Sequence, residues 1–123
     1  VILIIGILAA IALPTFLGQR SKAQDSSAKS DARNMVSQVE SCFATSQNYG
    51  NCMTQAQLEA DGPTGLSIGS GAGQVEVTSG TGTTGYVVVA HAKTGRDYTI
   101  TKDANGISRT CAPTGGGCNG TTW

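Results

Sequence analysis

Apolar residues follow two different patterns in the first third of the chain. Residues 1–17 read VILIIGILAAIALPTFL and carry no charge, and the first charged side chain is Arg20. A helix that is apolar on every side must be buried, either in lipid or among other apolar helices. After Gly18 the apolar residues recur at intervals of three and four, which is typical of an amphipathic helix. The pattern therefore predicts one helix over residues 1–47 whose two halves have different surroundings.

The amphipathic half of this helix needs a surface that covers its apolar stripe. About 47 helical residues span roughly 70 Å, and the remaining chain of about 75 residues is too small to cover that length. The apolar half must therefore protrude. We also expect Asp25 and Lys29 to form an i,i+4 ion pair. The predicted stripe consists of Ala28, Ala32, Met35 or Val36, Val39 and Phe43, and the charged residues expected mostly outside it are Lys22, Asp25, Lys29, Asp31 and Arg33.

The second half of the chain alternates between apolar and polar positions as strands do. Four strands are predicted, around residues 75–77, 86–92, 98–100 and 107–111. Short segments rich in turn residues separate them, and Asn105-Gly106 is a strong hairpin signal. Short connections between successive strands give an antiparallel meander. The sequence therefore predicts an α+β fold, in which the C-terminal half of a long helix packs on a four-stranded antiparallel sheet.

The connecting region over residues 48–73 carries one helix signal. Thr54 and Gln57 have the spacing of a capping box, so a helix of about two turns is expected after Thr54 and ends before Gly62. Residues 65–73 read GLSIGSGAG and are predicted to form a flexible loop.

The apolar run at the N-terminus resembles a known family. In GILAAIALPTF, Gly6, the pair Ala9-Ala10 and Pro14 stand where the type IV pilins, the subunits of bacterial surface filaments, have them. The resemblance implies about eight further residues before Val1 in the mature chain, beginning with an N-methylated Phe and including a Glu. It implies the type IV pilin fold and a filament core formed by Val1, Ile2, Leu3, Ile4, Ile5, Gly6, Ile7, Leu8, Ala9, Ala10, Ile11, Ala12, Leu13, Pro14, Phe16 and Leu17.

Gly6 and Pro14 are expected to weaken the apolar half of the helix. Pro14 lacks a backbone donor and clashes with the carbonyl of Ala10, and glycine has a low helix propensity. In pilins this region kinks and often melts in part within the assembled filament, so the resemblance implies the same for Gly6 to Pro14. Gly6 and Ala10 also form a small-xxx-small pair, which lets two helices approach closely in an apolar setting.

Four cysteines together with an export-type N-terminus indicate disulfides formed in an oxidising compartment. Four cysteines allow three pairings, and we predict Cys42–Cys52 and Cys111–Cys118 because both loops are short enough to close locally. Pilins commonly close a C-terminal loop with a disulfide, whereas a Cys42–Cys52 bond departs from the family. A zinc site is the alternative, but the cysteine spacings do not match those of zinc knuckles.

Other motifs carry less weight. Residues 80–85 match the letters of a dinucleotide-binding loop, but a Val-rich strand follows where a helix would be needed, so a hairpin loop is predicted. Residues 103–106 have too few acidic neighbours for calcium and are predicted to form a turn. His91 has no nucleophile assigned to it and is interpreted as a sheet residue. Asn119 begins an Asn-Gly-Thr sequon, which makes it a candidate for glycosylation.

Composition restricts the partners and the chemistry. The formal net charge is zero and charged residues make up 13% of the chain. A chain with no excess of positive charge has no field that would hold nucleic acid, so no specific nucleic-acid partner is predicted. No catalytic constellation, cofactor motif or metal-ligand set is visible, so we do not predict an enzyme, a cofactor or a metal.

These observations predict a structural subunit, the major pilin of a type IV pilus (a fimbrium). Residues 1–24 would be the hydrophobic half-helix of the membrane and filament core, and residues 25–123 the globular head. The resemblance implies identical copies in a helical filament as partners, the inner membrane before assembly, and the pilus assembly machinery. It places the mature protein at the cell surface, in an extracellular filament. Cell adhesion, twitching motility and DNA uptake are roles of such pili, and the sequence does not select among them.

Two alternatives stay open. One is a major pseudopilin of a type II secretion system, which would share the fold. The other is a secreted soluble binding domain that retains part of a signal peptide, because Ala10-Ile11-Ala12 satisfies the A-x-A cleavage rule. The continuation of the helical pattern beyond Pro14 favours the pilin.

Overall fold

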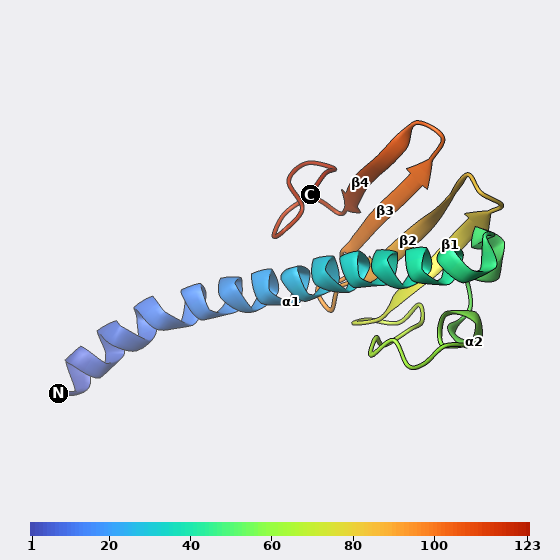
Figure 1. Ribbon diagram of the computed structural model, residues 1–123. Coiled ribbons are helices and arrows are strands. Elements are labelled where there is room, and N and C mark those ends of the chain that lie inside the picture. Colours follow the sequence, from blue (N-terminus) through green and yellow to red (C-terminus); the bar gives the residue numbers. More distant parts are fainter.

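The computed structural model describes residues 1–11 and 18–123 and shows a long helix packed on a four-stranded sheet (Figure 1). The predictions made for Ala12, Leu13, Pro14, Phe16 and Leu17 lie outside the described residues. In chain order the elements are α1 (Ile2–Ser46), the 3₁₀ helix η1 (Tyr49–Asn51), α2 (Gln55–Leu58), β1 (Val75–Thr81), β2 (Gly85–His91), β3 (Asp97–Asp103) and β4 (Gly106–Ala112).

Helix α1 confirms the predicted long N-terminal helix, with 45 residues. It ends where Gln47 adopts the left-handed conformation (φ 55°) and donates its backbone N–H to the carbonyl of Phe43 at 2.7 Å. This is a common way to satisfy the last carbonyls of a helix. In Figure 1 the C-terminal half of α1 lies across the sheet, and the N-terminal part projects beyond it.

The sheet confirms the predicted antiparallel meander, with strand order β1-β2-β3-β4. In its register Val88 of β2 stands opposite Val77 on one side and Ile100 on the other, and all three side chains are buried. A bulge between Val77 and Ser79 interrupts the pairing of β1 with β2. Gly85 begins β2 so close to β3 that a Cβ atom would collide with the carbonyl oxygen of Lys102. Only glycine fits this position of the hairpin.

One face of the sheet and one stripe of α1 form the core. Strand β2 alternates, with Tyr86, Val88 and Ala90 buried and Val87 and Val89 only half-buried. This face packs on the stripe predicted from the sequence, whose buried members are Ala28, Ala32, Met35 and Val39, with Val36 and Phe43 partly buried beside them. Strand β4 lies at the sheet edge and is almost wholly exposed. The head is therefore built around β1, β2, β3 and the second half of α1.

The connecting region over residues 48–73 contains a shorter helix than expected, and its loop is hydrogen-bonded to the sheet. The capping box is present, because the Thr54 side chain accepts from the N–H of Gln57 while the Gln57 side chain accepts from the N–H of Thr54. Helix α2 nevertheless has only one turn, and Gly62 follows it with φ 139°. The loop over 65–73 is tied to β1, since Val75 donates to the carbonyl of Ser67 at 2.9 Å.

Candidate assembly surface

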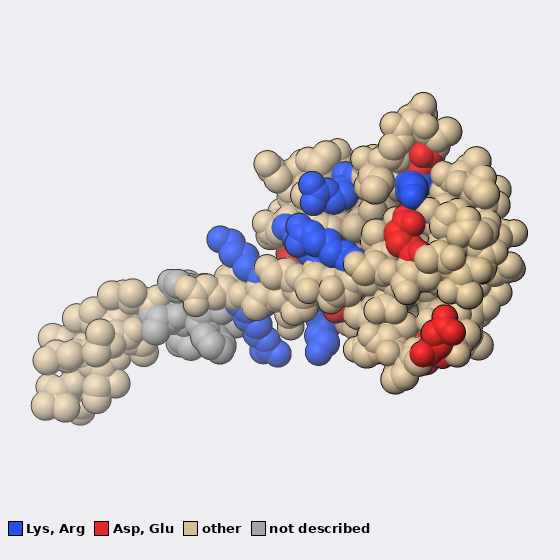
Figure 2. Space-filling view, viewed as in Figure 1, with Lys and Arg blue, Asp and Glu red and all other residues tan. Residues whose placement is uncertain are grey.

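The first eleven residues of the chain form an exposed apolar helix surface. Val1 is 95% exposed, and even the least exposed large side chain among them, Ile7, is 53% exposed. Figure 2 shows this segment without a charged side chain, and the charged side chains begin only nearer the head. Contiguous apolar surface of this kind marks a contact with other molecules or with a membrane. The apolar residues open to solvent here are Val1, Ile2, Leu3, Ile4, Ile5, Ile7, Leu8 and Ile11.

Small residues divide this surface. Gly6, Ala9 and Ala10 are all exposed, and a Cβ atom placed on Gly6 would meet nothing within 4 Å. The glycine therefore has no packing role within the monomer. Its lack of a side chain leaves room for the backbone of another helix to approach, which is the contact that small-xxx-small pairs allow in apolar surroundings.

Asp25 marks the transition from the exposed helix to the packed helix. Among the described residues it is the first of α1 to be fully buried. This corrects the expectation that Asp25 lies off the apolar stripe and pairs with Lys29. The Asp25 carboxylate instead accepts hydrogen bonds from the Thr94 hydroxyl at 2.6 Å and from the Gly117 backbone N–H at 2.8 Å. It also forms an ion pair with Arg96 at 3.3 Å. Lys29 lies over the ring of Tyr98.

The surroundings of Asp25 favour its charged form. Burial by itself raises the pKa of a carboxyl group, but the hydrogen bonds from Thr94 and Gly117 and the charge of Arg96 more than offset it. The Tyr98 hydroxyl acts in the same direction, although it makes no well-formed hydrogen bond. The pKa of Asp25 is therefore lowered, while burial and the nearby carboxylate raise the pKa of Tyr98 to about 12. A charged Asp25 joins three segments: α1, the β2–β3 turn and the C-terminal loop.

A second polar cluster joins α1 to the sheet at the far end of the head. Lys102 of β3 donates to Glu40 at 2.9 Å and to the Tyr49 hydroxyl at 2.7 Å. Tyr49 in turn donates to the Glu40 carboxylate and stacks on Phe43, with ring centroids 4.2 Å apart. Burial alone would raise the pKa of Glu40, but Lys102 and Tyr49 lower it. The packed half of α1 is therefore held at both ends by a buried or half-buried carboxylate.

The two predicted disulfides are confirmed. Cys42 at the end of α1 pairs with Cys52, and Cys111 of β4 pairs with Cys118, with Cα–Cα distances of 5.9 and 5.7 Å. The second bond closes the loop that places Gly117 on Asp25. A Cβ atom on Gly117 would lie 2.8 Å from the Tyr98 hydroxyl, so a larger residue there would push the loop away.

The C-terminal loop carries an aromatic anchor that no local sequence pattern predicts. Trp123 meets the ring of Tyr98 edge-on and donates its indole N–H to the carbonyl of Thr110 at 2.9 Å. The guanidinium groups of Arg33 and Arg109 lie over its ring at 5.1 and 5.4 Å from the centroid. Asn119, the sequon residue, is exposed in this loop. The loop is therefore docked on both α1 and the sheet.

His91 is a residue of β2, as interpreted from the sequence, and its side chain is held by two carboxylates. Its Nδ1 atom is 2.7 Å from Asp97 and its Nε2 atom 3.0 Å from Glu76. Partial burial lowers the pKa of a histidine, but the two carboxylates outweigh it and raise the pKa of His91. Residues 80–85 and 103–106 form strand ends and hairpin turns, as predicted.

Comparisons place no known protein beside this one. No protein-family model, no curated protein and no solved structure matches the chain. Within residues 1–11 and 18–123, no helix is long and apolar enough to cross a membrane. The sequence resemblance and the exposed apolar surface are the observations that bear on function.

Proposed function

We propose that this chain is a structural subunit, a pilin, that polymerises through its apolar N-terminal helix into a type IV pilus. The observation that supports the proposal most strongly is the contrast within α1. The same helix exposes large apolar side chains over residues 1–11 and buries a regular stripe from Ala28 onward. An exposed apolar extension of this size is stable in water only when other apolar surfaces cover it, so it marks a contact site.

We propose that residues 1–11 of neighbouring copies pack against one another and so cover this apolar surface. Apolar helices that carry small residues can bundle closely, and the exposed Gly6 and Ala10 lie one turn apart on this surface. Helices that are apolar all round suit the interior of such a bundle as well as lipid. Subunits would wait in the inner membrane and pass into the filament without exposing the segment to water. The head would then form the outer surface of the filament.

The experiment that tests this proposal introduces a charge into the segment. Ala10→Glu places a carboxylate where the bundle is expected to be dry, which costs several kcal/mol unless the charge is paired. Native cells expressing the wild-type chain should release filaments of this protein on shearing, seen by electron microscopy with an antibody against the head. The Ala10→Glu cells should release none, and normal filaments from this variant would contradict the proposal.

A matched substitution controls for folding and export. Thr78→Glu adds the same charge to an exposed position of β1 in the head, and it should leave filament yield near that of the wild type. Mass spectrometry of the N-terminal peptide from the same shear fraction supplies an independent measurement. A methylated Phe and a Glu upstream of Val1 would support prepilin processing. A mature chain that starts near Leu13 would instead support the secreted domain, and filaments confined to the periplasm would support the pseudopilin.

A further inference from the structure

Charges on the head are sorted along the axis of α1. Basic side chains outnumber acidic ones where α1 enters the head: Arg20, Lys22, Lys29 and Arg33 lie there with Asp25 and Asp31, and Lys93 of the β2–β3 turn lies there too, because that turn contacts Asp25. The opposite end of the head carries Glu40, Asp61 and Asp103, with Lys102 paired to Glu40. Figure 2 shows blue side chains gathered near the base of the projecting helix and red ones farther along the head. The chain as a whole is neutral, so the two ends are complementary to each other.

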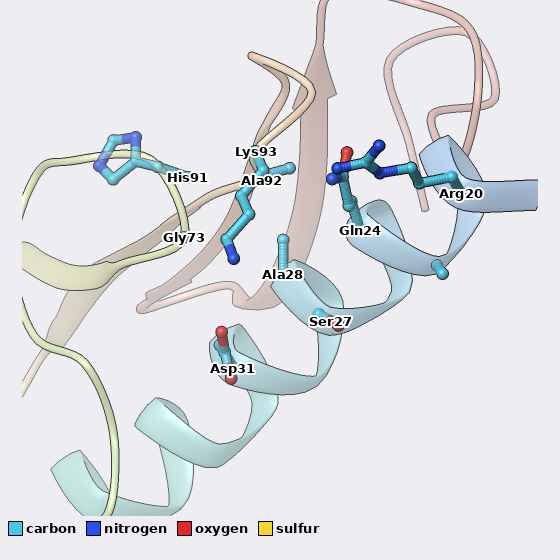
Figure 3. A pocket seen from close by; sticks show the side chains of 10 residues that line it. Arg20, Gln24, Ser27, Ala28, Asp31, Gly73, His91, Ala92 and Lys93 are labelled. Carbon is cyan, nitrogen blue, oxygen red and sulfur yellow. The ribbon is translucent and has the colours of Figure 1, made fainter. Parts of the chain in front are cut away.

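A pocket of about 320 Å³ lies at the basic end, between α1 and the β2–β3 turn. We call it the neck pocket. Arg20 and Gln24 reach into it from α1, and the Lys93 side chain extends toward Ala28 on the opposite wall (Figure 3). Its walls include the small residues Ala28, Gly73 and Ala92, so a side chain from outside can enter. The His91 ring points away from the other labelled side chains.

An exposed acidic loop lies at the other end of the same flank of α1. Residues 59–63, the distal loop, follow α2, and residues 60–63 border a second pocket against the last turns of α1. The Glu59 carboxylate already accepts hydrogen bonds from the Gln55 side chain of α2 and from the Thr64 hydroxyl. Asp61 at the tip is exposed and makes no hydrogen bond or ion pair with any residue in the part of the chain that the structure describes. Its carboxylate is therefore available to another molecule.

The neck pocket and the pocket beside the distal loop lie on the same face of α1. Arg20, Ser27 and Asp31 border the neck pocket, and Gln38 and Thr45 border the pocket next to the distal loop. Steps of three, four and seven residues keep a helical side chain on one face, so both pockets lie on the same flank. The centres of the two sets are about 16 residues apart, which is roughly 23 Å along the axis. Because both features face the same side of the head, a second copy must be turned about an axis parallel to α1 as well as displaced by about that length to bring its distal loop to the neck pocket.

We infer that Asp61 of one subunit binds in the neck pocket of the next, between Arg20 and Lys93. The inference rests on the proposed function, because it assigns a head contact to the filament. The contact is heterologous, and such contacts generate open-ended assemblies when they do not close into a ring. Asp31 is the acidic group of the pocket, and it opposes an incoming carboxylate. Charge complementarity at both ends of the head favours a second copy over anionic lipid, which would use the basic end alone.

A charge swap tests this contact in cells that assemble the protein. The paired change Arg20→Glu with Lys93→Glu replaces attraction by repulsion and should lower the yield of sheared filaments roughly tenfold. Adding Asp61→Lys to the same chain should restore the yield to within about twofold of the wild type, because the opposite charges now face each other in reverse. Asp61→Lys alone should lower the yield as the pocket variant does.

Two further variants separate the contact from general electrostatics. Lys22→Glu reverses one positive charge on another face of α1, two residues from Arg20, and should leave the yield within about twofold of the wild type. Asp31→Asn removes the opposing carboxylate and should raise the yield at low ionic strength. Thermal melting of each purified variant shows whether the head is still folded.

The outcomes distinguish the inference from the function on which it rests. Recovery of filaments only in the charge-swapped chain supports the contact. Wild-type filaments together with a failed rescue overturn it, and so does an equal loss from Lys22→Glu, because a basic surface that meets lipid would respond to either cation. Wild-type cells without filaments of this protein would overturn the proposed function as well. Binding of the purified chain to phosphatidylglycerol vesicles that is lost in the Arg20→Glu, Lys93→Glu chain, without any rescue by Asp61→Lys, would assign the neck to lipid.

Discussion

Helix α1 contains two regions that meet water in opposite ways. Over residues 1–11 every described side chain is exposed, including large apolar ones such as Leu3 at 76%. From Asp25 to Val39 the buried positions recur every three or four residues and fit the alternating face of the sheet. Both regions are equally helical, so backbone propensity does not distinguish them. The difference shows that the pattern of burial distinguishes the residues that stabilise the folded head from the residues that stay exposed and available to a partner. Helix formation by itself does not distinguish them.

The strongest test of this comparison makes the same substitution in both regions. Ala32 is fully buried, so Ala32→Glu places an unpaired carboxylate in the core and should cost at least about 4 kcal/mol, enough to unfold most of the head. Ala10→Glu should leave the melting temperature of the head within about 1 °C, because Ala10 is exposed and lies on the part of α1 that projects from the head (Figure 1). Circular dichroism melts in mild detergent measure both. Equal losses of stability would mean that the two regions fold as one unit.

Loss of the C-terminal disulfide should have a smaller effect, confined to the packed region. The double change Cys111→Ser with Cys118→Ser should lower the free energy of unfolding by about 2–3 kcal/mol, because the closed loop restricts the unfolded chain. Urea denaturation under non-reducing conditions measures the loss. Cys42→Ser with Cys52→Ser, which opens a loop of similar length, is the matched control and should cost about as much. An unchanged urea midpoint would argue against the bond between Cys111 and Cys118.

The smallest of these effects is expected where the two regions meet. Asp25→Asn keeps the shape of the side chain but removes its charge, and should cost about 1.5–2 kcal/mol at pH 7 because charge-assisted hydrogen bonds are lost. The folded-state pKa of Asp25 is lowered, so its contribution is present above the ordinary value of 3.8 and is lost as the pH falls through the folded-state pKa.

The pH dependence makes this effect specific. Urea midpoints at pH 7 and at pH 3 should differ less for Asp25→Asn than for the wild type. Asp61→Asn, at an exposed carboxylate, should behave as the wild type does. A variant as sensitive to acid as the wild type would show that other carboxylates, such as Glu40, account for the loss.

The fold was predictable because its signals are local. Strand alternation, the capping box at Thr54 and the turn at Asn105-Gly106 each depend on residues close in sequence, and the structure contains all three. The disulfides were predictable for the same reason, since each joins cysteines ten or fewer positions apart. The length of α2 was not, because the helix ends where Glu59 accepts from Thr64 and Gly62 turns the chain.

Asp25 shows where prediction from sequence failed and why. Its partners Thr94, Arg96 and Gly117 lie 69, 71 and 92 positions away, so no local spacing indicates them. Its charge and the nearby Lys29 favoured a surface interpretation. One signal was present, since position 25 is in phase with Ala28 and Ala32 on the buried stripe. A charged residue in phase with a core stripe is a reason to look for a buried partner elsewhere in the chain.

The placement of the disulfides has a mechanical consequence. One bond joins the end of α1 to the segment directly after it, and the other joins β4 to the loop that follows. Neither crosses from α1 to the sheet. Each disulfide closes only a short local loop of the head. The helix is held on the sheet by apolar packing and by the polar clusters around Asp25 and Glu40. Apart from the backbone that connects the end of α1 to β1, a load pulled along α1 therefore passes into the sheet through non-covalent contacts.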